Sequence, residues 1–366
     1  MKISDIDKNL KISDGVAPES AVWFDAKAEP FKLFGIFYEE ETAQYTRMPK
    51  KVYDTVSNGV ALLAPYTAGG RLKFKTNSPF IGIKAVMKNV EMMGHMTLAC
   101  ESGFDLYAKG DDGYDCYCHT FMPPIGMKEG YSSIYKADKM VNDCHIAYND
   151  QIFEYTINFP LYDGVQELYI ALDKDAVLLE ADDYNDIKPM VFYGSSITQG
   201  GCTSRPGNAY PAMITRMFNI DHINLGFSGN CKGESTMADY LASLDMSVFI
   251  CDYDHNAPTA EHLKVTLADI YAKVRKNHPN LPYIFVSATD AKLFPAAFNH
   301  RKEVIFEAYQ NALALGDKNV YFIDGSKLFD GDGWDSCTVD GCHPNDLGFF
   351  RMAQGISKVI KEALKL

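Results

Sequence analysis

The hydrophobic pattern of this chain changes its period near residue 185, and this change constrains the fold more than any other feature. Before that point, short apolar and aromatic runs alternate with turn residues, as in closely spaced strands. After it, short apolar runs alternate with longer segments of helical periodicity. The 366 residues are about twice the length of a common single domain. We therefore expect two domains, at residues 1–185 and 186–366.

The first region is expected to be a β-sandwich or a jelly-roll-like domain. Turn signals such as Ser57-Asn58-Gly59 and Ala68-Gly69-Gly70 separate its apolar runs. The region contains no long stretch of helical periodicity that would favour a helical domain instead. The predicted strands include residues 21–24, 60–63, 80–86, 96–99, 154–159 and 167–172.

The second region is expected to be an α/β domain, with a parallel sheet covered by helices on both faces. In such sheets, ligands bind beyond the carboxyl ends of the strands, so functional side chains should directly follow strands. The predicted strands are residues 190–193, 223–225, 246–251, 281–286 and 320–323. The predicted helices are residues 209–218, 235–244, 260–276, 297–315 and 347–364.

Two segments at opposite ends of this region carry a candidate nucleophile and a candidate base. Gly194-Ser195-Ser196-Ile197-Thr198 directly follows the first predicted strand, and a serine at such a turn exposes its hydroxyl. In Asp340-Gly341-Cys342-His343-Pro344, the proline keeps His343 out of the following helix. Asp340 can then hold the Nδ1–H of His343. Taken separately, the serines and Asp340 are more typical of turns and helix caps than of catalysis.

Two further loops after predicted strands offer hydrogen-bond donors. Gly229 follows the second strand and has a backbone N–H that a ligand can approach closely. Asn256 follows the third strand and offers a side-chain amide. Together with the N–H of Ser196, these groups can stabilise an oxyanion. In isolation, each segment is also typical of an ordinary turn.

The four blocks, in this order, resemble the signature of the SGNH, or GDSL-type, hydrolase superfamily. The resemblance covers residues 188–366 and implies a flavodoxin-like domain that hydrolyses esters through an acyl-enzyme. It implies Ser196 as nucleophile, His343 as general base and Asp340 as the residue that orients His343. The Ser196 N–H, Gly229 and Asn256 would form the oxyanion hole, and no metal or organic cofactor is implied.

The sequence departs from the family pattern at two places. Ser195 replaces the aspartate that precedes the nucleophile in the family, and Asp254-His255-Asn256-Ala257 replaces the usual Gly-x-Asn-Asp. These departures indicate a divergent branch and leave Ser195 as a rival nucleophile. In the first region, Gly103-Phe104-Asp105-Leu106-Tyr107 resembles the Gly-x-Asp-Leu-Tyr motif of a domain that precedes some SGNH esterases.

Two side chains are candidates for substrate contact. Trp334 precedes Asp340 by six residues and could stack on a sugar ring or anchor its loop. Arg205 follows the nucleophile turn and could bind substrate hydroxyls or remain solvated. A metal site of Cys116, Cys118 and His119 with Cys144-His145 is disfavoured, because the C-x₂-C spacing of structural zinc sites is absent.

Charge and composition limit the classes of binding partner and the cellular location that we expect. The formal net charge of −13 disfavours nucleic acids and anionic membranes. The first residues lack the apolar core of a secretory signal, and the nine cysteines are typical of reduced thiols. We therefore expect a cytoplasmic protein and leave open whether it forms a homo-oligomer.

A small-molecule or oligosaccharide ester is the expected substrate. We favour an esterase that removes a small acyl group, acetyl, from a carbohydrate, since a β-sandwich before an SGNH domain resembles carbohydrate acetylesterases. The first alternative is a lipase- or lysophospholipase-like enzyme that acts on longer acyl chains. The second is a carbohydrate-binding protein whose esterase half is inactive.

Overall fold

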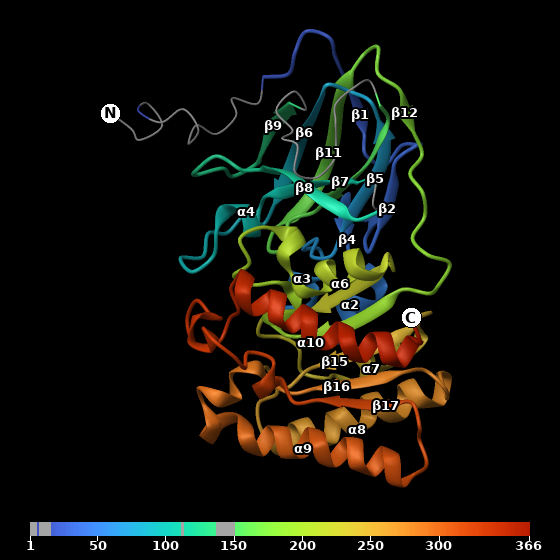
Figure 1. Cartoon of the computed structure of the whole chain (residues 1–366), viewed down its shortest axis with the longest axis vertical. Coiled ribbons are helices and arrows are strands. Elements are labelled where there is room, and N and C mark those ends of the chain that lie inside the picture. Colours follow the sequence, from blue (N-terminus) through green and yellow to red (C-terminus); the bar gives the residue numbers. More distant parts are fainter. Residues whose placement is uncertain (1–5, 7–15, 111–112, 137–150) are drawn as a thin grey trace.

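The two regions lie one above the other along the longest axis of the molecule, with the β-strands of the first at one end and the helix-covered sheet of the second at the other (Figure 1). The computed structural model describes residue 6 and residues 16–110, 113–136 and 151–366. Cys144 and His145 lie outside the described residues. Cys116 and Cys118 are half-buried against the core of the first region, as expected for thiols that fill gaps between strands.

Two antiparallel sheets form the first region, and their apolar faces share one core. One sheet has the order β1-β11-β6-β9 and the other β12-β5-β10-β7-β8, with β2 on β5. The predicted β-sandwich is thus confirmed. Its strands are β1 (Ala21–Asp25), β2 (Lys32–Phe34), β5 (Arg71–Thr76), β6 (Phe80–Lys88), β7 (Phe104–Lys109), β8 (Asp115–Phe121), β9 (Gly130–Lys136), β10 (Phe153–Asn158), β11 (Gly164–Asp173) and β12 (Leu178–Leu179), beside the hairpin β3 (Phe37–Glu39) and β4 (Gln44–Thr46).

Two predicted strands of this region are helices instead. Residues 60–63 belong to α3 (Asn58–Leu63), which follows α2 (Lys50–Val56), and residues 98–99 begin α4 (Leu98–Glu101). The Ser57 and Thr97 side chains accept hydrogen bonds from the third residue after them, so each caps the start of its helix. The prediction was wrong because a short apolar run does not show whether it has the period of a strand or of a helix. Here the cap residue before each run marks the start of a helix.

The second region is a parallel sheet of order β14-β13-β15-β16-β17, which is the flavodoxin-like order. Its strands are β13 (Met190–Gly194), β14 (His222–Gly226), β15 (Val248–Asp252), β16 (Tyr283–Val286) and β17 (Val320–Ile323). Its long helices are α6 (Tyr210–Phe218), α7 (Ser235–Ser243), α8 (Ala260–Asn277), α9 (Pro295–Ala314) and α10 (Asp346–Leu364). The predicted α/β fold is confirmed.

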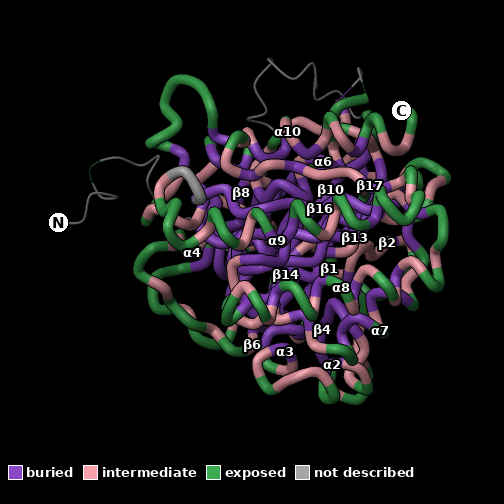
Figure 2. The backbone as a smooth tube through the Cα atoms, turned by 90° about the horizontal axis from the view of Figure 1, so that it is seen from below, coloured by how far each residue is buried: buried purple, intermediate pink, exposed green. Residues whose placement is uncertain are grey.

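Alternating side chains of the sheet supply two separate cores. In β13, Val191 and Tyr193 pack with α7, α8 and α9, while Met190 and Phe192 pack with α6 and α10. Successive side chains of a strand point to opposite faces, and helices cover both faces here. Figure 2 shows the resulting buried backbone at the centre of the molecule and exposed backbone at its periphery. Within the described residues, no helix has the length and apolar character needed to cross a membrane.

The helices α2 and α3 lie between β4 and β5 in the sequence but pack against the parallel sheet. Val60 and Leu63 share a core with Leu225 of β14 and with α7. The buried Arg47 guanidinium donates to the carbonyl oxygens of Gly226 (2.7 Å) and Leu63 (2.7 Å). This packing joins the two regions along β14, and the division at residues 185 and 186 is retained as a proposal.

Candidate active site

The adjacent serines at the end of β13 have different partners. Ser195 is buried, and its Oγ accepts a hydrogen bond from the Ile197 N–H at 3.2 Å, which caps α5 (Ser196–Gln199). The Oγ of Ser196 lies 2.9 Å from Nε2 of His343. The structure therefore brings Ser196 to the histidine and gives Ser195 a capping role.

Asp340 holds the opposite side of the His343 ring. Its Oδ2 lies 2.7 Å from Nδ1, and its Oδ1 accepts hydrogen bonds from the backbone N–H groups of His343 (2.7 Å) and Cys342 (3.0 Å). Partial burial alone would raise the pKa of Asp340, but the hydrogen bonds from His343 and Cys342 outweigh it and lower this pKa to about 2. An ionised carboxylate keeps the ring proton on Nδ1, so Nε2 can accept the serine proton.

The Gly229 loop follows β14 and is attached to the nucleophile turn. The N–H of Phe227 donates to the carbonyl oxygen of Gly194 at 2.8 Å, and that of Ser228 donates to Oε1 of Gln199 at 2.9 Å. Gly229 has a φ of +66°, and no described atom lies within 4 Å of where its Cβ would stand. This left-handed, open position suits glycine and leaves space above the backbone.

Asn256 lies in the loop after β15, and the surrounding ion pairs fix that loop. Its Oδ1 accepts a hydrogen bond from the Cys231 N–H at 3.3 Å, which leaves the amide hydrogens for another acceptor. The neighbouring His255 lies between Asp254 (3.2 Å) and Asp290 (3.0 Å). Burial alone would lower the pKa of His255, yet the two carboxylates raise it well above its usual value. The oxyanion-hole roles of Gly229 and Asn256 stay predictions.

The Gly-x-Asp-Leu-Tyr segment of the first region forms hydrogen bonds with the loop that follows α5. Buried Asp105 accepts hydrogen bonds from the Gly207 N–H at 2.8 Å and from Nδ2 of Asn158 at 2.7 Å. The Tyr107 hydroxyl accepts one from Arg205 at 2.9 Å. The motif therefore joins the sandwich to the chain next to the nucleophile turn.

The two predicted substrate contacts lie on connecting segments, Arg205 after α5 and Trp334 between β17 and α10. The same guanidinium nitrogen of Arg205 also donates to Oδ1 of Asn208 at 2.7 Å, and the guanidinium stacks on the Tyr117 ring at 4.1 Å, so the side chain is held at the interface. Trp334 begins a short 3₁₀ turn and is 37% exposed, which leaves ring surface open to solvent. Substrate contact by either residue stays a prediction.

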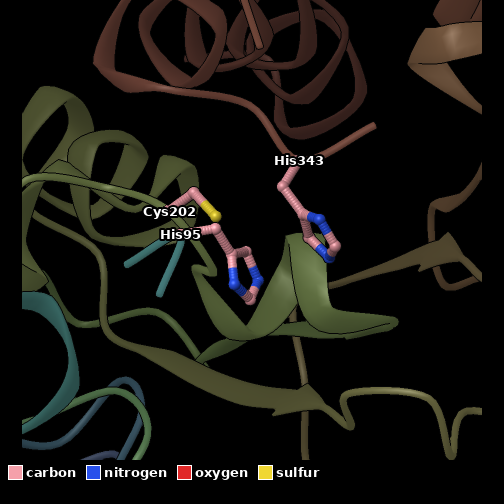
Figure 3. Close-up of side chains that lie close together, drawn as sticks. All are labelled: His95, Cys202 and His343. Atoms are coloured by element: carbon pink, nitrogen blue, oxygen red, sulfur yellow. The ribbon is translucent and has the colours of Figure 1, made fainter. Parts of the chain in front are cut away.

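Two residues of the first region reach the site without having been predicted from the sequence. The Tyr162 hydroxyl donates a hydrogen bond to the carbonyl oxygen of Ser196 at 3.2 Å. His95 places its ring centroid 5.5 Å from that of His343, and Figure 3 shows both rings beside Cys202. Both contacts join residues far apart in the chain, so no local pattern could have indicated them.

Comparison with known proteins agrees with this arrangement. Residues 187–361 match the model of the GDSL-like lipase/acylhydrolase family, and residues 21–178 match GxDLY, the N-terminal domain of SGNH-hydrolase-type esterases. A structure described as a GDSL-like lipase from Bacteroides ovatus is 30% identical, with a TM-score of 0.81 over 94% of this chain and 98% of the other. No curated protein matches the chain.

More distant structures share the fold over nearly the whole length. The salicylyl-acyltransferase SsfX3 from a tetracycline biosynthetic pathway is 15% identical, with a TM-score of 0.73 over 95% of this chain and 100% of the other. An acetyl xylan esterase from Butyrivibrio proteoclasticus is 12% identical, with a TM-score of 0.57 over 95% and 99%. Both domains and their order are thus shared with known relatives. The chain belongs to the GDSL-like lipase/acylhydrolase family of SGNH hydrolases and is an ester hydrolase.

Proposed function

We propose that this protein is a serine esterase that works through an acyl-enzyme. His343 removes the proton of Ser196, whose oxygen attacks the ester carbonyl and expels the alcohol. The Ser196 N–H, Gly229 and Asn256 stabilise the oxyanion. His343 returns its proton to the leaving alcohol and then activates the water that releases the acid.

The hydrogen-bond chain from Ser196 through His343 to Asp340 carries this proposal. Its two links are 2.9 Å and 2.7 Å long, within the range expected of a nucleophile and its oriented base. Ser195 lacks such a link because its hydroxyl is used as a helix cap. The open space at Gly229 agrees with an approach of the substrate to the backbone there.

We further propose that the substrate carries a small acyl group, acetyl, on a carbohydrate. Relatives with both domains include the acetyl xylan esterase and a family two carbohydrate esterase from Clostridium thermocellum that was solved with cellohexaose. At 12% identity these structures support the fold, and the substrate class is an inference by analogy. The residues that reach the site from the sandwich, His95 and Tyr162, agree with a cleft that both domains border.

A labelling experiment tests the nucleophile. A phosphonate ester should add to Ser196, and mass spectrometry of the digested protein should locate it there. Ser196→Ala should lose both the adduct and nearly all hydrolysis of p-nitrophenyl acetate. The matched variant Ser195→Ala should keep both and lose only about 1 kcal/mol of stability, as for an N-cap. An adduct on Ser195 would overturn the assignment.

A substrate comparison tests the acyl group. The ratio kcat/KM should be higher for p-nitrophenyl acetate than for p-nitrophenyl octanoate, and acetylated xylo-oligosaccharides should release acetate. Faster turnover of octanoate would favour the lipase-like alternative. If the wild-type protein hydrolyses no ester, the carbohydrate-binding alternative gains instead.

A further inference from the structure

Three metal-ligating side chains meet where the two regions join. His95 comes from the loop between β6 and α4, Cys202 follows α5, and His343 lies before α10. One nitrogen or sulfur atom from each lies within 4.8 Å of the other two, and Figure 3 shows the three side chains close together. His95 is exposed, Cys202 is buried and His343 is half-buried, so the cluster extends from the protein interior to the surface.

The chemistry of this donor set favours zinc. Two imidazoles and a thiolate are borderline-soft ligands, which suit Zn²⁺ and disfavour Mg²⁺ and Ca²⁺. With metal–ligand bonds of about 2.0–2.3 Å, a tetrahedral ion holds its ligand atoms roughly 3.3–3.8 Å apart. The exposed His95 side chain can rotate to close the remaining gap. A water molecule would fill the fourth position.

The Asp340–His343 pair supplies the outer contact that metal-bound histidines usually have. Asp340 accepts the Nδ1–H of His343 at 2.7 Å, and a carboxylate in this position fixes the ring and raises its basicity toward a metal. Since Nδ1 is occupied, Nε2 is the nitrogen left for the ion. That same atom faces the hydroxyl of Ser196.

The backbone at Cys202 is held in an unusual conformation. Its φ is +74°, in the left-handed region that favours glycine, and the two residues before it are Gly200 and Gly201. A side chain held there at a backbone cost is typical of a functional position. A cysteine binds a metal ion as the thiolate, so a thiol at this position loses its proton on binding.

We propose that His95, Cys202 and His343 form an inhibitory zinc site across the boundary between the two domains. Binding converts the Cys202 thiol to a zinc-bound thiolate and releases one proton to solvent. The ion takes the lone pair of Nε2, so His343 can no longer accept the proton of Ser196. The inhibition rests on the role proposed for His343 above, whereas metal binding does not depend on it.

Zinc inhibition of ester hydrolysis is the first test. Zn²⁺ in slight molar excess should suppress p-nitrophenyl acetate hydrolysis by the wild-type protein, and a chelator should restore it. For His95→Ala and Cys202→Ala, half-inhibition should require at least about tenfold more Zn²⁺, relative to the metal-free rate of each variant. His95 is exposed, so its variant serves even if the Cys202 variant does not fold.

Cys342→Ala is the matched control. Cys342 neighbours His343 in sequence but belongs to a different cluster, with His255 and Asp290. Its removal should leave the zinc sensitivity unchanged. The proposal is overturned if Zn²⁺ does not inhibit the wild-type protein, if the His95 and Cys202 variants stay as sensitive as wild type, or if Cys342→Ala alone abolishes the inhibition.

Cobalt spectroscopy tests the site without relying on activity. Co²⁺ should bind in a one-to-one ratio and give a thiolate-to-cobalt charge-transfer band, present in the wild-type protein and Cys342→Ala and absent in Cys202→Ala. A band that persists in Cys202→Ala would overturn the site. Metal binding with undiminished hydrolysis would overturn the inhibition and count against His343 as the base. A protein that binds the metal as expected but hydrolyses no ester would contradict the proposed function alone.

Discussion

The hydroxyl of Tyr162 donates a hydrogen bond to the carbonyl oxygen of Ser196 at 3.2 Å. Tyr162 lies between β10 and β11 of the sandwich and is buried, and its hydroxyl also contacts Ser228 in the loop that carries Gly229. One side chain of the first domain therefore contacts both loops of the proposed catalytic machinery. The sandwich helps to fix the site in addition to bordering it.

Tyr162→Phe should lower kcat without abolishing activity. Each neutral hydrogen bond that is lost costs about 0.5–1.5 kcal/mol, so loss of the bond to Ser196 alone corresponds to at most roughly tenfold in rate if it is felt in the transition state. Steady-state kinetics with p-nitrophenyl acetate measures this effect. Tyr45→Phe is the control, because the buried Tyr45 hydroxyl has no hydrogen-bond partner among the described residues. Equal kcat values for the two variants would show that Tyr162 only fills space.

Asp340→Asn should reduce kcat by about 10³–10⁴-fold while the protein stays folded, since an amide stabilises neither the required tautomer nor the imidazolium. The pKa of about 2 keeps Asp340 ionised throughout the assay range, so protonation of this carboxylate should not limit activity in mild acid. Kinetics across pH, with circular dichroism as a check on folding, measures both. Asp332→Asn, which changes an exposed carboxylate nearby, should stay close to wild type. Comparable losses in both variants would contradict the orienting role.

The sequence predicted the elements whose pattern is local and missed the contacts that only the fold creates. The alternation of strand and helix periods was sufficient to predict the parallel sheet. The positions of Ser196 and His343 in loops of this domain were sufficient to predict that the two residues lie close together. The family resemblance implied Ser196, but the sequence left Ser195 as a rival, because the cap bond from Ile197 to Ser195 has no distinctive sequence pattern. His95 and Tyr162 were missed because they reach the site through the packing of two domains, and α3 was missed because its apolar run is short.

Gly207→Ala should weaken the junction between the domains. An added Cβ would lie 2.6 Å from Cε2 of Tyr107 and 2.8 Å from Oδ2 of Asp105, so the Gly-x-Asp-Leu-Tyr segment would have to move. Overpacking of this kind typically costs about 1–3 kcal/mol. Urea denaturation should show this loss, and kcat/KM should fall because the shifted loop follows the nucleophile turn. Gly94→Ala has no described atom within 4 Å of the new Cβ and should change neither quantity. A fully stable and active Gly207→Ala would contradict this account of the motif.

Glu101→Gln should change how the free energy of unfolding depends on pH. Glu101 is buried and accepts a hydrogen bond from the Met93 N–H at 2.6 Å. Burial raises its pKa from 4.5 to about 7, although the bond from Met93 opposes this shift. Between pH 4.5 and about pH 7, the folded protein therefore keeps a proton on Glu101 that the unfolded chain releases. The contribution of this proton to the free energy of unfolding is fully present below pH 4.5 and is lost as the pH rises through about 7.

Glutamine resembles the protonated carboxyl, so the variant should lose less stability than wild type between about pH 5 and about pH 8. At the higher pH, Glu101→Gln should be the more stable protein by an amount on the order of 1 kcal/mol. Urea denaturation at the two pH values measures the difference, and Glu129→Gln, which alters an exposed carboxylate, should follow the wild-type curve. The burial cost of Glu101 would be disproved by stability curves of wild type and Glu101→Gln that run parallel across this range.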